Sequence, residues 1–185
     1  GVKAIGTQAH EWPMFHAAVY GPRSANRIAL KNWIKVYQGN LGIALPDTYT
    51  TNVFLRSFDL LNAKIWDGLR EDSDPNPPAF ATKVIRHYLN LGVNPLSKSI
   101  VFSNSINSHK TMDIIADACE KQIGFSFGIG GWLTNDTPSA INMVIKLDSV
   151  KIGDEWYPAV KLSDSSGKIT GSRSEATLYK KLLRI

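Results

Sequence analysis

Side chains capable of acid–base or anion chemistry follow five short apolar runs of the sequence. The segments that carry them are GTQAHE (6–11), PDTYTT (46–51), DGLREDSDP (67–75), FSNSIN (102–107) and FGIGGWLTND (127–136). In a parallel α/β protein the carboxyl ends of the strands meet at one edge or face, and binding sites form there. We therefore expect these five segments to build one site.

The glycine-rich segment offers a site for an anion. Gly128, Gly130 and Gly131 follow a predicted strand, and a backbone without Cβ atoms allows successive N–H groups to approach a ligand closely. The spacing is neither G-x-G-x-x-G nor a P-loop. The segment is either a turn that serves strand geometry alone or a cradle for a phosphate group.

The segment DGLREDSDP adds a cation and carboxylates. The guanidinium of Arg70 is able to grip a carboxylate or a phosphate through two hydrogen bonds, and Asp72 is able to orient it or hold a metal through water. Ser73 lies beside them, and Asp47 follows another predicted strand. A solvated charged loop is the plainer interpretation of this segment.

His10 lies where a predicted strand passes into a predicted helix, an unusual place for a titratable ring. The other histidines, His16, His87 and His109, lie in amphipathic or helical stretches where packing or solvation accounts for them. The sequence has no H-E-x-x-H motif, no C-x-x-C pair and no nucleophile elbow. Structural zinc and serine-hydrolase chemistry are therefore not expected.

The composition indicates one globular domain with a basic surface. The 185 residues are 43% hydrophobic, and 21 basic against 16 acidic residues give a formal charge of +5. This charge favours anionic partners and by itself leaves phosphorylated metabolites, nucleic acid and anionic lipid open. The single cysteine, Cys119, forms no internal disulfide, and no apolar run is long enough to span a membrane. We expect a cytoplasmic protein.

Hydrophobic periodicity predicts βα units. Strands are expected at 2–5, 41–45, 63–68, 99–104 and 124–129, and helices at 23–38, 48–57, 78–91 and 108–121. Beyond residue 140, alternating runs at 141–147 and 157–163 predict an antiparallel pair, and residues 174–185 predict a terminal helix. The pattern fits an open doubly wound sheet or part of an eight-unit barrel.

Taken together and in order, five motifs resemble the later portion of nicotinate phosphoribosyltransferase: GTQAHEW, LGIALPDTYTTNVFLRSF, DGLREDSDP, FGIGGWLTND and KLSDSSGK. The resemblance extends over essentially all of residues 1–185. It implies an α/β fold, an irregular and incomplete TIM-like α/β barrel with a C-terminal antiparallel strand pair and a terminal helix. It also implies a homodimer and an amino-terminal domain that this sequence lacks. We expect residues 1–185 to be the C-terminal part of the barrel domain of a longer polypeptide.

The resemblance also implies a reaction. Nicotinate and 5-phosphoribosyl 1-diphosphate would give nicotinate mononucleotide and diphosphate in NAD salvage, with Mg²⁺ and coupled ATP hydrolysis. His10 matches the histidine that ATP phosphorylates transiently in this family. Nucleic acid and membranes are not expected partners.

Other positions take implied roles by matching family motifs. Thr7 and Arg70 match the nicotinate pocket, with Asp72 and Ser73 beside Arg70, and Asp47 matches a pocket carboxylate; Asp72 joins His10 as a catalytic candidate. The phosphate-binding candidates are Gly128, Gly130, Gly131, Ser103 and Asn104. Lys161 and Lys168 fall on a basic motif without an assigned role, and no metal ligands are assigned.

Three segments depart from the family pattern. FSNS replaces the usual FSDG-like turn, GIGG replaces GIGT, and DSDPNP replaces DSGDP. These changes concern phosphate and magnesium binding. Two other functions stay open: a nicotinamide-specific phosphoribosyltransferase, and a non-catalytic relative that binds phosphorylated metabolites.

Overall fold

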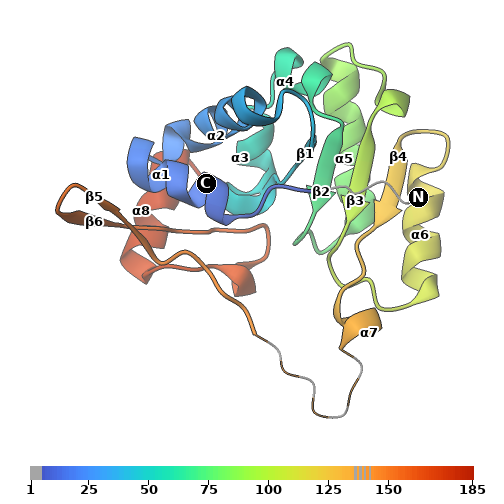
Figure 1. Cartoon of the computed structure of the whole chain (residues 1–185). Helices are drawn as coiled ribbons and strands as arrows, with labels where there is room; N and C mark the ends of the chain where they lie inside the picture. The colour runs from blue at the N-terminus through green and yellow to red at the C-terminus, as the bar shows by residue number, and fades with distance from the viewer. Residues whose placement is uncertain (1–5, 136, 138, 140, 142) are drawn as a thin grey trace.

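The computed structural model describes residues 6–135, 137, 139, 141 and 143–185 (Figure 1). The strand expected at 2–5 lies outside the described residues. The fold is mixed α/β, with a four-stranded parallel sheet and a separate antiparallel pair of strands. No described helix has the length and apolar character needed to cross a membrane.

The parallel sheet follows the order of the chain. Strands β1 (Ile43–Ala44), β2 (Gly68–Glu71), β3 (Ser99–Phe102) and β4 (Gly124–Phe127) are neighbours in that order. Thr7 forms a parallel bridge to Ile43, so the segment before α1 continues the sheet beyond β1. The carboxyl ends of these strands therefore lie side by side, as expected from the sequence.

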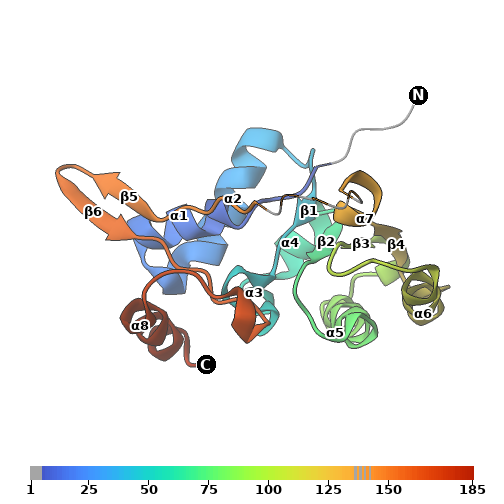
Figure 2. The same ribbon diagram turned by 90° about the horizontal axis from the view of Figure 1, so that it is seen from below.

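Helices connect successive strands. The 3₁₀ turn η1 (Asp47–Tyr49), α3 (Thr51–Leu55) and α4 (Leu60–Ile65) join β1 to β2, α5 (Pro77–Asn90) joins β2 to β3, and η2 (Pro95–Ser97) precedes β3. Helix α6 (His109–Cys119) joins β3 to β4, and α7 (Gly131–Thr134) follows β4. Figure 2 shows α5 and α6 on the same side of the sheet and α7 on the other. The helices that connect β2 to β3 and β3 to β4 therefore lie on one face, which differs from the open doubly wound sheet that the sequence also allowed, and the short α7 only follows the last strand.

The main core lies between the sheet and these helices. Leu69, Ile100 and Phe102 of the strands are buried against Phe80 and Tyr88 of α5. The helices begin at side-chain caps, because Asn76 and Ser108 accept hydrogen bonds from the first turns of α5 and α6. Packing on one face fixes the sheet and leaves its other face for the site.

The first and last parts of the chain pack together beside the sheet. They comprise α1 (Glu11–Tyr20), α2 (Pro22–Tyr37), the hairpin of β5 (Ser149–Ile152) and β6 (Glu155–Pro158), η3 (Ser166–Lys168) and α8 (Arg173–Leu183). A second core joins Ala17 and Ala25 of α1 and α2 to Tyr179 and Leu183 of α8, with Tyr49 of η1 among them. Figure 1 shows α8 beside α1 and α2, so helices from the early and the late part of the chain are neighbours.

Several predicted elements are confirmed and three are displaced. The helices expected at 23–38, 78–91, 108–121 and 174–185 and the strands expected at 41–45, 99–104 and 124–129 are present with slightly different ends. The strand expected at 63–68 is wrong, because Asp59 caps helix α4 through Asn62 N–H and the strand begins only at Gly68. Arg70 therefore lies within β2 and not in the loop after it.

Two further predictions need correction. The helix expected at 48–57 is divided into η1 and α3 at Thr50, which has a φ of 76°. The antiparallel pair expected at 141–147 and 157–163 is displaced: the described residues of 141–147 form no strand, and the hairpin forms at Ser149–Ile152 and Glu155–Pro158, around the turn at Gly153. A two-residue turn with a positive φ at Gly153 sets this register.

Candidate active site

Arg70 is held by three side chains at the strand ends. Its Nε donates to Ser103 Oγ (2.7 Å), Nη1 to Thr7 Oγ1 (3.1 Å) and Nη2 to Asp72 Oδ1 (2.6 Å). A guanidinium has about five N–H groups, and three donate here, so one remains on each Nη. These two N–H groups form a fork of the kind that grips a carboxylate.

His10 joins two of the predicted segments. Its Nε2 lies 3.0 Å from Asp72 Oδ2 and its Nδ1 lies 3.0 Å from Thr48 Oγ1. Because Asp72 is an acceptor when ionised, Nε2 carries the proton and Nδ1 accepts the hydrogen bond of the Thr48 hydroxyl. The ring is only 5% exposed, since it sits at the start of α1 against η1.

Asp47 is the most buried carboxylate of this group, with an exposed fraction of 1%. Its Oδ2 accepts a hydrogen bond of 2.5 Å from Ser73 and lies 3.7 Å from Lys161 Nζ, and its Oδ1 lies 3.7 Å from His10 Nε2. Oδ1 accepts no hydrogen bond from the described residues. A buried carboxylate oxygen without a hydrogen-bond partner is unusual, and a small cation is one group that would satisfy it.

The C-terminal part of the chain supplies two cations. Lys161 reaches Asp47, and Lys168 Nζ donates to the Asp72 carbonyl oxygen (2.8 Å) and to Asn104 Oδ1 (3.0 Å). The side chain of Asn104 in turn donates to the Asp74 carbonyl oxygen (3.2 Å). Lys168 thus ties the loop after β2 to the loop after β3.

Two cavities flank the row formed by Arg70, Asp72 and His10. One, of about 520 Å³, is lined by Gly6, Thr7, Arg70, Val101, Ser103, Ser126, Phe127, Gly128, Ile129 and Gly130. The other, of about 390 Å³, is lined by His10, Asp72, Val144, Lys146, Lys161, Gly167, Lys168, Ile169 and Thr170. The first combines an arginine fork with an apolar wall, and the second is rich in lysine.

The glycine loop borders the first cavity. Gly128 and Gly130 line it, whereas Gly131 begins α7 and is not among the lining residues. A Cβ at Gly130 would meet no atom within 4 Å, while one at Gly128 would lie 3.1 Å from Ser103 Cβ. Packing does not require glycine at 130, so its presence suits close approach of a ligand.

The adjacent carboxyls of Glu71 and Asp72 have pKa values shifted in opposite directions by burial and by their hydrogen-bond and charge partners. Burial acts to raise the pKa of Asp72, but the hydrogen bond from His10 and the charge and hydrogen bond of Arg70 hold that pKa well below its usual range. Burial raises the pKa of Glu71 to about 7 against the hydrogen bond from Asp74 N–H. Burial also lowers the pKa of Lys161, although Asp47 opposes this shift.

His10, Asp47 and Asp72 are also the described residues that group as metal donors. One donor atom from each lies within 4.8 Å of the others. Mg²⁺ is commonly held by one or two carboxylates together with water and substrate phosphates. The unpaired Oδ1 of Asp47 fits that mode, whereas both oxygens of Asp72 are already engaged.

The structure thus gathers most of the residues singled out from the sequence. Thr7, His10, Asp47, Arg70, Asp72, Ser73, Ser103 and Asn104 are linked by the hydrogen bonds and ion pairs above, and Lys161 and Lys168 join them. Two residues of the site were not predicted from the sequence. They are Thr48, whose hydroxyl is hydrogen-bonded to the His10 ring, and Asp164, whose carboxylate accepts a hydrogen bond from Thr51 N–H. The sequence signals that could have identified them are the position of Thr48 directly after Asp47 and the position of Asp164 inside the motif KLSDSSGK.

Comparison with known proteins follows from this geometry. The fold and site place the chain among α/β proteins that collect polar side chains at the carboxyl ends of parallel strands. The model of the nicotinate phosphoribosyltransferase (NAPRTase) family matches residues 1–184. The chain belongs to this family.

Individual relatives agree. Nicotinate phosphoribosyltransferase of Desulforapulum autotrophicum is 46% identical over 94% of this chain and 45% of its own length, and that of Methanosarcina mazei is 46% identical over 94% and 42%. The crystal structure of the Porphyromonas gingivalis enzyme has a TM-score of 0.93 and 43% identity, covering 100% of this chain and 48% of that one. The chain therefore spans about half the length of these relatives.

Proposed function

We propose that this chain carries the site at which nicotinate phosphoribosyltransferase joins nicotinate to 5-phosphoribosyl 1-diphosphate. The observation that carries the proposal is the fork of two N–H groups on Arg70 at a cavity of about 520 Å³. The fork suits the carboxylate of a pyridine acid, and Phe127 and Ile129 supply apolar walls for its ring.

The chemistry requires positioning more than a protein nucleophile. The pyridine nitrogen forms a bond to the anomeric carbon as the bond from that carbon to the diphosphate oxygen breaks, and positive charge develops on the sugar ring. Arg70 would orient the acceptor, and backbone groups near Gly128 and Gly130 would receive the 5-phosphate beside Ser103, whereas Asn104 is bonded to Lys168 and does not line this cavity. Such positioning is worth several kcal/mol of the barrier, on the order of 7–11 in the best cases.

ATP coupling fits the second cavity. Once the Thr48 hydroxyl releases His10 Nδ1, the lone pair on that nitrogen would attack the γ-phosphorus of ATP, so that an N–P bond forms, the P–O bond to ADP breaks and ADP leaves. The ionised Asp72 holds the proton on Nε2 and stabilises the charge of the ring. Lys146, Lys161 and Lys168 line the same cavity and would receive the added phosphoryl charge.

Mg²⁺ belongs to the same proposal. Asp47 would hold the ion through Oδ1, with Asp72 close by and substrate phosphates and water completing its shell. When bound, the ion neutralises diphosphate charge. The lysines of the second cavity provide the same neutralisation from the protein side.

The remaining proposals concern the assembly. We expect the sheet to form part of an incomplete α/β barrel, because its strands follow the order of the chain and α5 and α6 lie on one face. We also expect the active form to be a homodimer. We expect it to need the further sequence that the relatives contain, which are about twice as long as this chain.

A diphosphate-release assay tests the proposed function. The protein is supplied with Mg²⁺, 5-phosphoribosyl 1-diphosphate and either nicotinate or nicotinamide, with and without ATP, and the nucleotide product is identified by mass. We expect nicotinate mononucleotide and a rate increase with ATP. Turnover with nicotinamide but not with nicotinate would instead indicate a nicotinamide phosphoribosyltransferase. If a dimeric full-length protein binds 5-phosphoribosyl 1-diphosphate without turnover, the protein would be a non-catalytic binding protein.

A further inference from the structure

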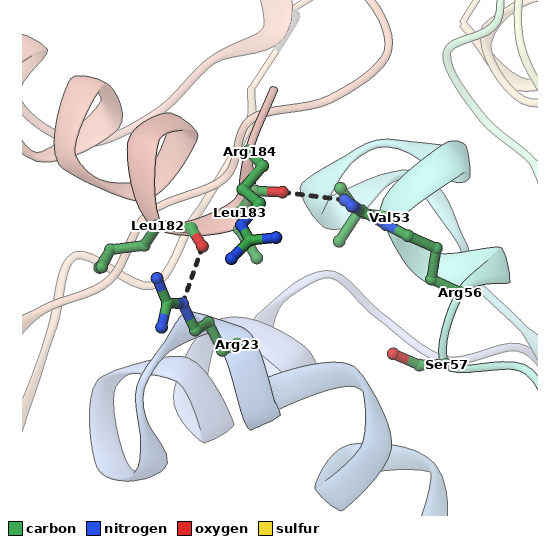
Figure 3. A pocket seen from close by; sticks show the side chains of 7 residues that line it. All are labelled: Arg23, Val53, Arg56, Ser57, Leu182, Leu183 and Arg184. Carbon is green, nitrogen blue, oxygen red and sulfur yellow. Dashed lines mark hydrogen bonds between the residues drawn. The ribbon is translucent and has the colours of Figure 1, made fainter.

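Three arginines line a further cavity, which is formed by α2, the end of α3 and the end of α8. Arg23 of α2, Arg56 after α3 and Arg184 after α8 line a pocket of about 300 Å³ with Val53, Ser57, Leu182 and Leu183 (Figure 3). None of these residues lines either cavity of the candidate active site. Figure 3 shows the side chains of Arg23 and Arg184 directed into the same space between three helical segments.

The positive charge of this pocket has no carboxylate partner in the described part of the chain. None of the ion pairs found within 4.0 Å among the described residues includes Arg23, Arg56 or Arg184. The three side chains are exposed, so water and salt screen their mutual repulsion, and an anion held between them would lower what remains of it.

Two of the arginines also hold the end of α8. Arg23 Nε donates to the Leu182 carbonyl (2.9 Å) and Arg56 Nη2 donates to the Leu183 carbonyl (2.9 Å). These bonds satisfy carbonyls that a helix end leaves unpaired, and they fix the two guanidinium groups in place. Both Nη atoms of Arg23 and the Nε and Nη1 of Arg56 remain for another acceptor.

Arg184 is the C-cap residue of α8 and holds the helix end only through its backbone, whose N–H donates to the Lys181 carbonyl (3.3 Å). Its side chain donates none of the hydrogen bonds found among the described residues, yet it faces the pocket from the residue that follows α8. Capping of α8 therefore uses the side chains of Arg23 and Arg56 but only the backbone of Arg184, whose guanidinium makes no hydrogen bond within the described part of the chain.

We propose that this arginine pocket binds the diphosphate group of a small molecule. Planar guanidinium forks match phosphoryl oxygens, and three positive charges suit a diphosphate better than a single phosphate. Ser57 offers a hydroxyl in the same space, and Val53 and Leu183 line it with apolar atoms on which an organic group attached to the diphosphate would pack, whereas the Leu182 side chain points away and only its carbonyl faces Arg23 (Figure 3). The site is independent of the proposed phosphoribosyl transfer.

Nuclear magnetic resonance of the ¹⁵N-labelled protein tests the pocket directly. The Nε–Hε signals of Arg23, Arg56 and Arg184 are followed during titration with inorganic diphosphate, ADP or AMP at ionic strength held constant with NaCl. We expect saturable shifts with diphosphate and ADP and a weaker effect of AMP. Tighter binding of ADP than of free diphosphate would identify a nucleotide as the source of the group, and equal binding would identify free diphosphate.

The matched variants are Arg184→Gln and Arg173→Gln. Arg184→Gln removes the charge without disturbing the bonds of Arg23 and Arg56, and it keeps an unbranched side chain at a backbone φ of 59°. It should weaken diphosphate binding about tenfold, since a charge-assisted hydrogen bond is lost. Arg173→Gln makes the same charge change at the exposed start of α8 and should leave the affinity within about twofold.

Three results would overturn the proposal. They are shifts that NaCl alone reproduces, an unchanged affinity in folded Arg184→Gln, and equally tight binding of a glutamate-rich peptide. The Nε–Hε signal of Arg70 reports binding at the candidate active site in the same spectra, so the failure of one site is distinguishable from the failure of the other.

Discussion

At the residue scale, Arg70 is the side chain that makes acid selectivity testable. Arg70→Lys keeps a positive charge near Asp72 but loses the fork and the bonds to Ser103 and Thr7. We expect the nicotinate KM to rise by one to two decades, because charge-assisted bonds are worth roughly 1.5–3 kcal/mol. Steady-state kinetics with each substrate varied in turn measure this change.

The phosphoribosyl donor and a surface arginine serve as controls for Arg70. The donor KM should change by less than about threefold, since the fork faces the acceptor. Arg86→Ala on the exposed side of α5 should leave both constants unchanged. Equal losses for the two substrates in Arg70→Lys would mean that Arg70 only organises the strand ends.

His10 separates ATP coupling from transfer. His10→Ala removes the proposed phosphoryl acceptor but not the residues that position nicotinate, so ATP hydrolysis and ATP stimulation should be abolished while slow transfer without ATP continues. Incubation with γ-labelled ATP should give an acid-labile, base-stable label on the wild type only.

A matched histidine tests the specificity of that label. His109→Ala, at the exposed start of α6, should retain full labelling. If His10→Ala is labelled like the wild type, His10 is not the acceptor. If transfer and stability fall together, its bonds to Thr48 and Asp72 serve only the fold.

Glu71 predicts a pH dependence of stability. Its pKa in the folded protein, about 7, lies above the ordinary value of 4.5 because the group is buried. A carboxyl with a raised folded pKa stabilises the protein fully below the unfolded pKa, and this contribution is lost as the pH rises through the folded pKa. The unpaired Oε2 of Glu71 is consistent with that loss.

The substitution that measures this effect is Glu71→Gln. The amide keeps an acceptor for Asp74 N–H without a charge, so the variant should exceed the wild type by about 1–3 kcal/mol at pH 8 and by much less at pH 5. Urea denaturation at both pH values gives the comparison. Asp164 has a raised pKa and Asp72 a lowered one, but both are common to the two proteins. A pH-independent difference would contradict the assignment.

At the scale of elements, the sequence predicted best where one apolar face repeats. Helices α5 and α6 have regular buried positions and caps at Asn76 and Ser108, so their extents were predictable. The structure of residues 63–68 was not predictable in this way, because the apolar residues of AKIWDG are compatible with either a helix or a strand. The cap at Asp59 and packing of Ala63 and Trp66 into the core decide in favour of a helix and a late strand.

Gly68 makes the register of β2 a testable element. A Cβ at Gly68 would lie 1.9 Å from the backbone oxygen of Ser99, its partner on β3. Gly68→Ala must therefore separate β2 from β3, and we expect a loss of about 3 kcal/mol or more, in the range of strongly destabilising core changes. Arg70 would move with the strand, so nicotinate binding should fall as well.

Gly167→Ala is the control for Gly68, because a Cβ there meets no atom within 4 Å. Thermal unfolding followed by circular dichroism should place Gly167→Ala close to the wild type. If Gly68→Ala unfolds at the wild-type temperature, the tight β2 to β3 register described here is wrong.

At the scale of the whole molecule, the site depends on segments that are remote in sequence. The rule that strand ends gather predicted the meeting of His10, Arg70 and Ser103, because a parallel sheet imposes it. It did not predict that residues 159–170 return to η1, where Leu162 N–H donates to the Thr48 carbonyl (2.8 Å). That contact is set by packing of α8 against α1, α2 and η1, which no local pattern encodes.

Asp164 is the side chain that fastens this returning segment. Its carboxylate accepts hydrogen bonds from Thr51 N–H (2.9 Å) and Thr51 Oγ1 (2.5 Å). Its own backbone N–H donates to Ser73 Oγ (3.2 Å), which in turn donates to Asp47.

Asp164→Ala leaves two polar groups of the buried Thr51 without partners, at a cost of about 1–3 kcal/mol. For a chain of this size we expect the midpoint of thermal unfolding to fall by about 3–10 °C. Asp113→Ala, which removes an exposed carboxylate from α6, should change it by less than about 2 °C. Equal, small shifts in the two variants would show that the C-terminal segment is held by its apolar core alone, whereas a large loss confined to Asp164→Ala would identify this carboxylate as the link from the C-terminal segment to α3 and to the loop after β2.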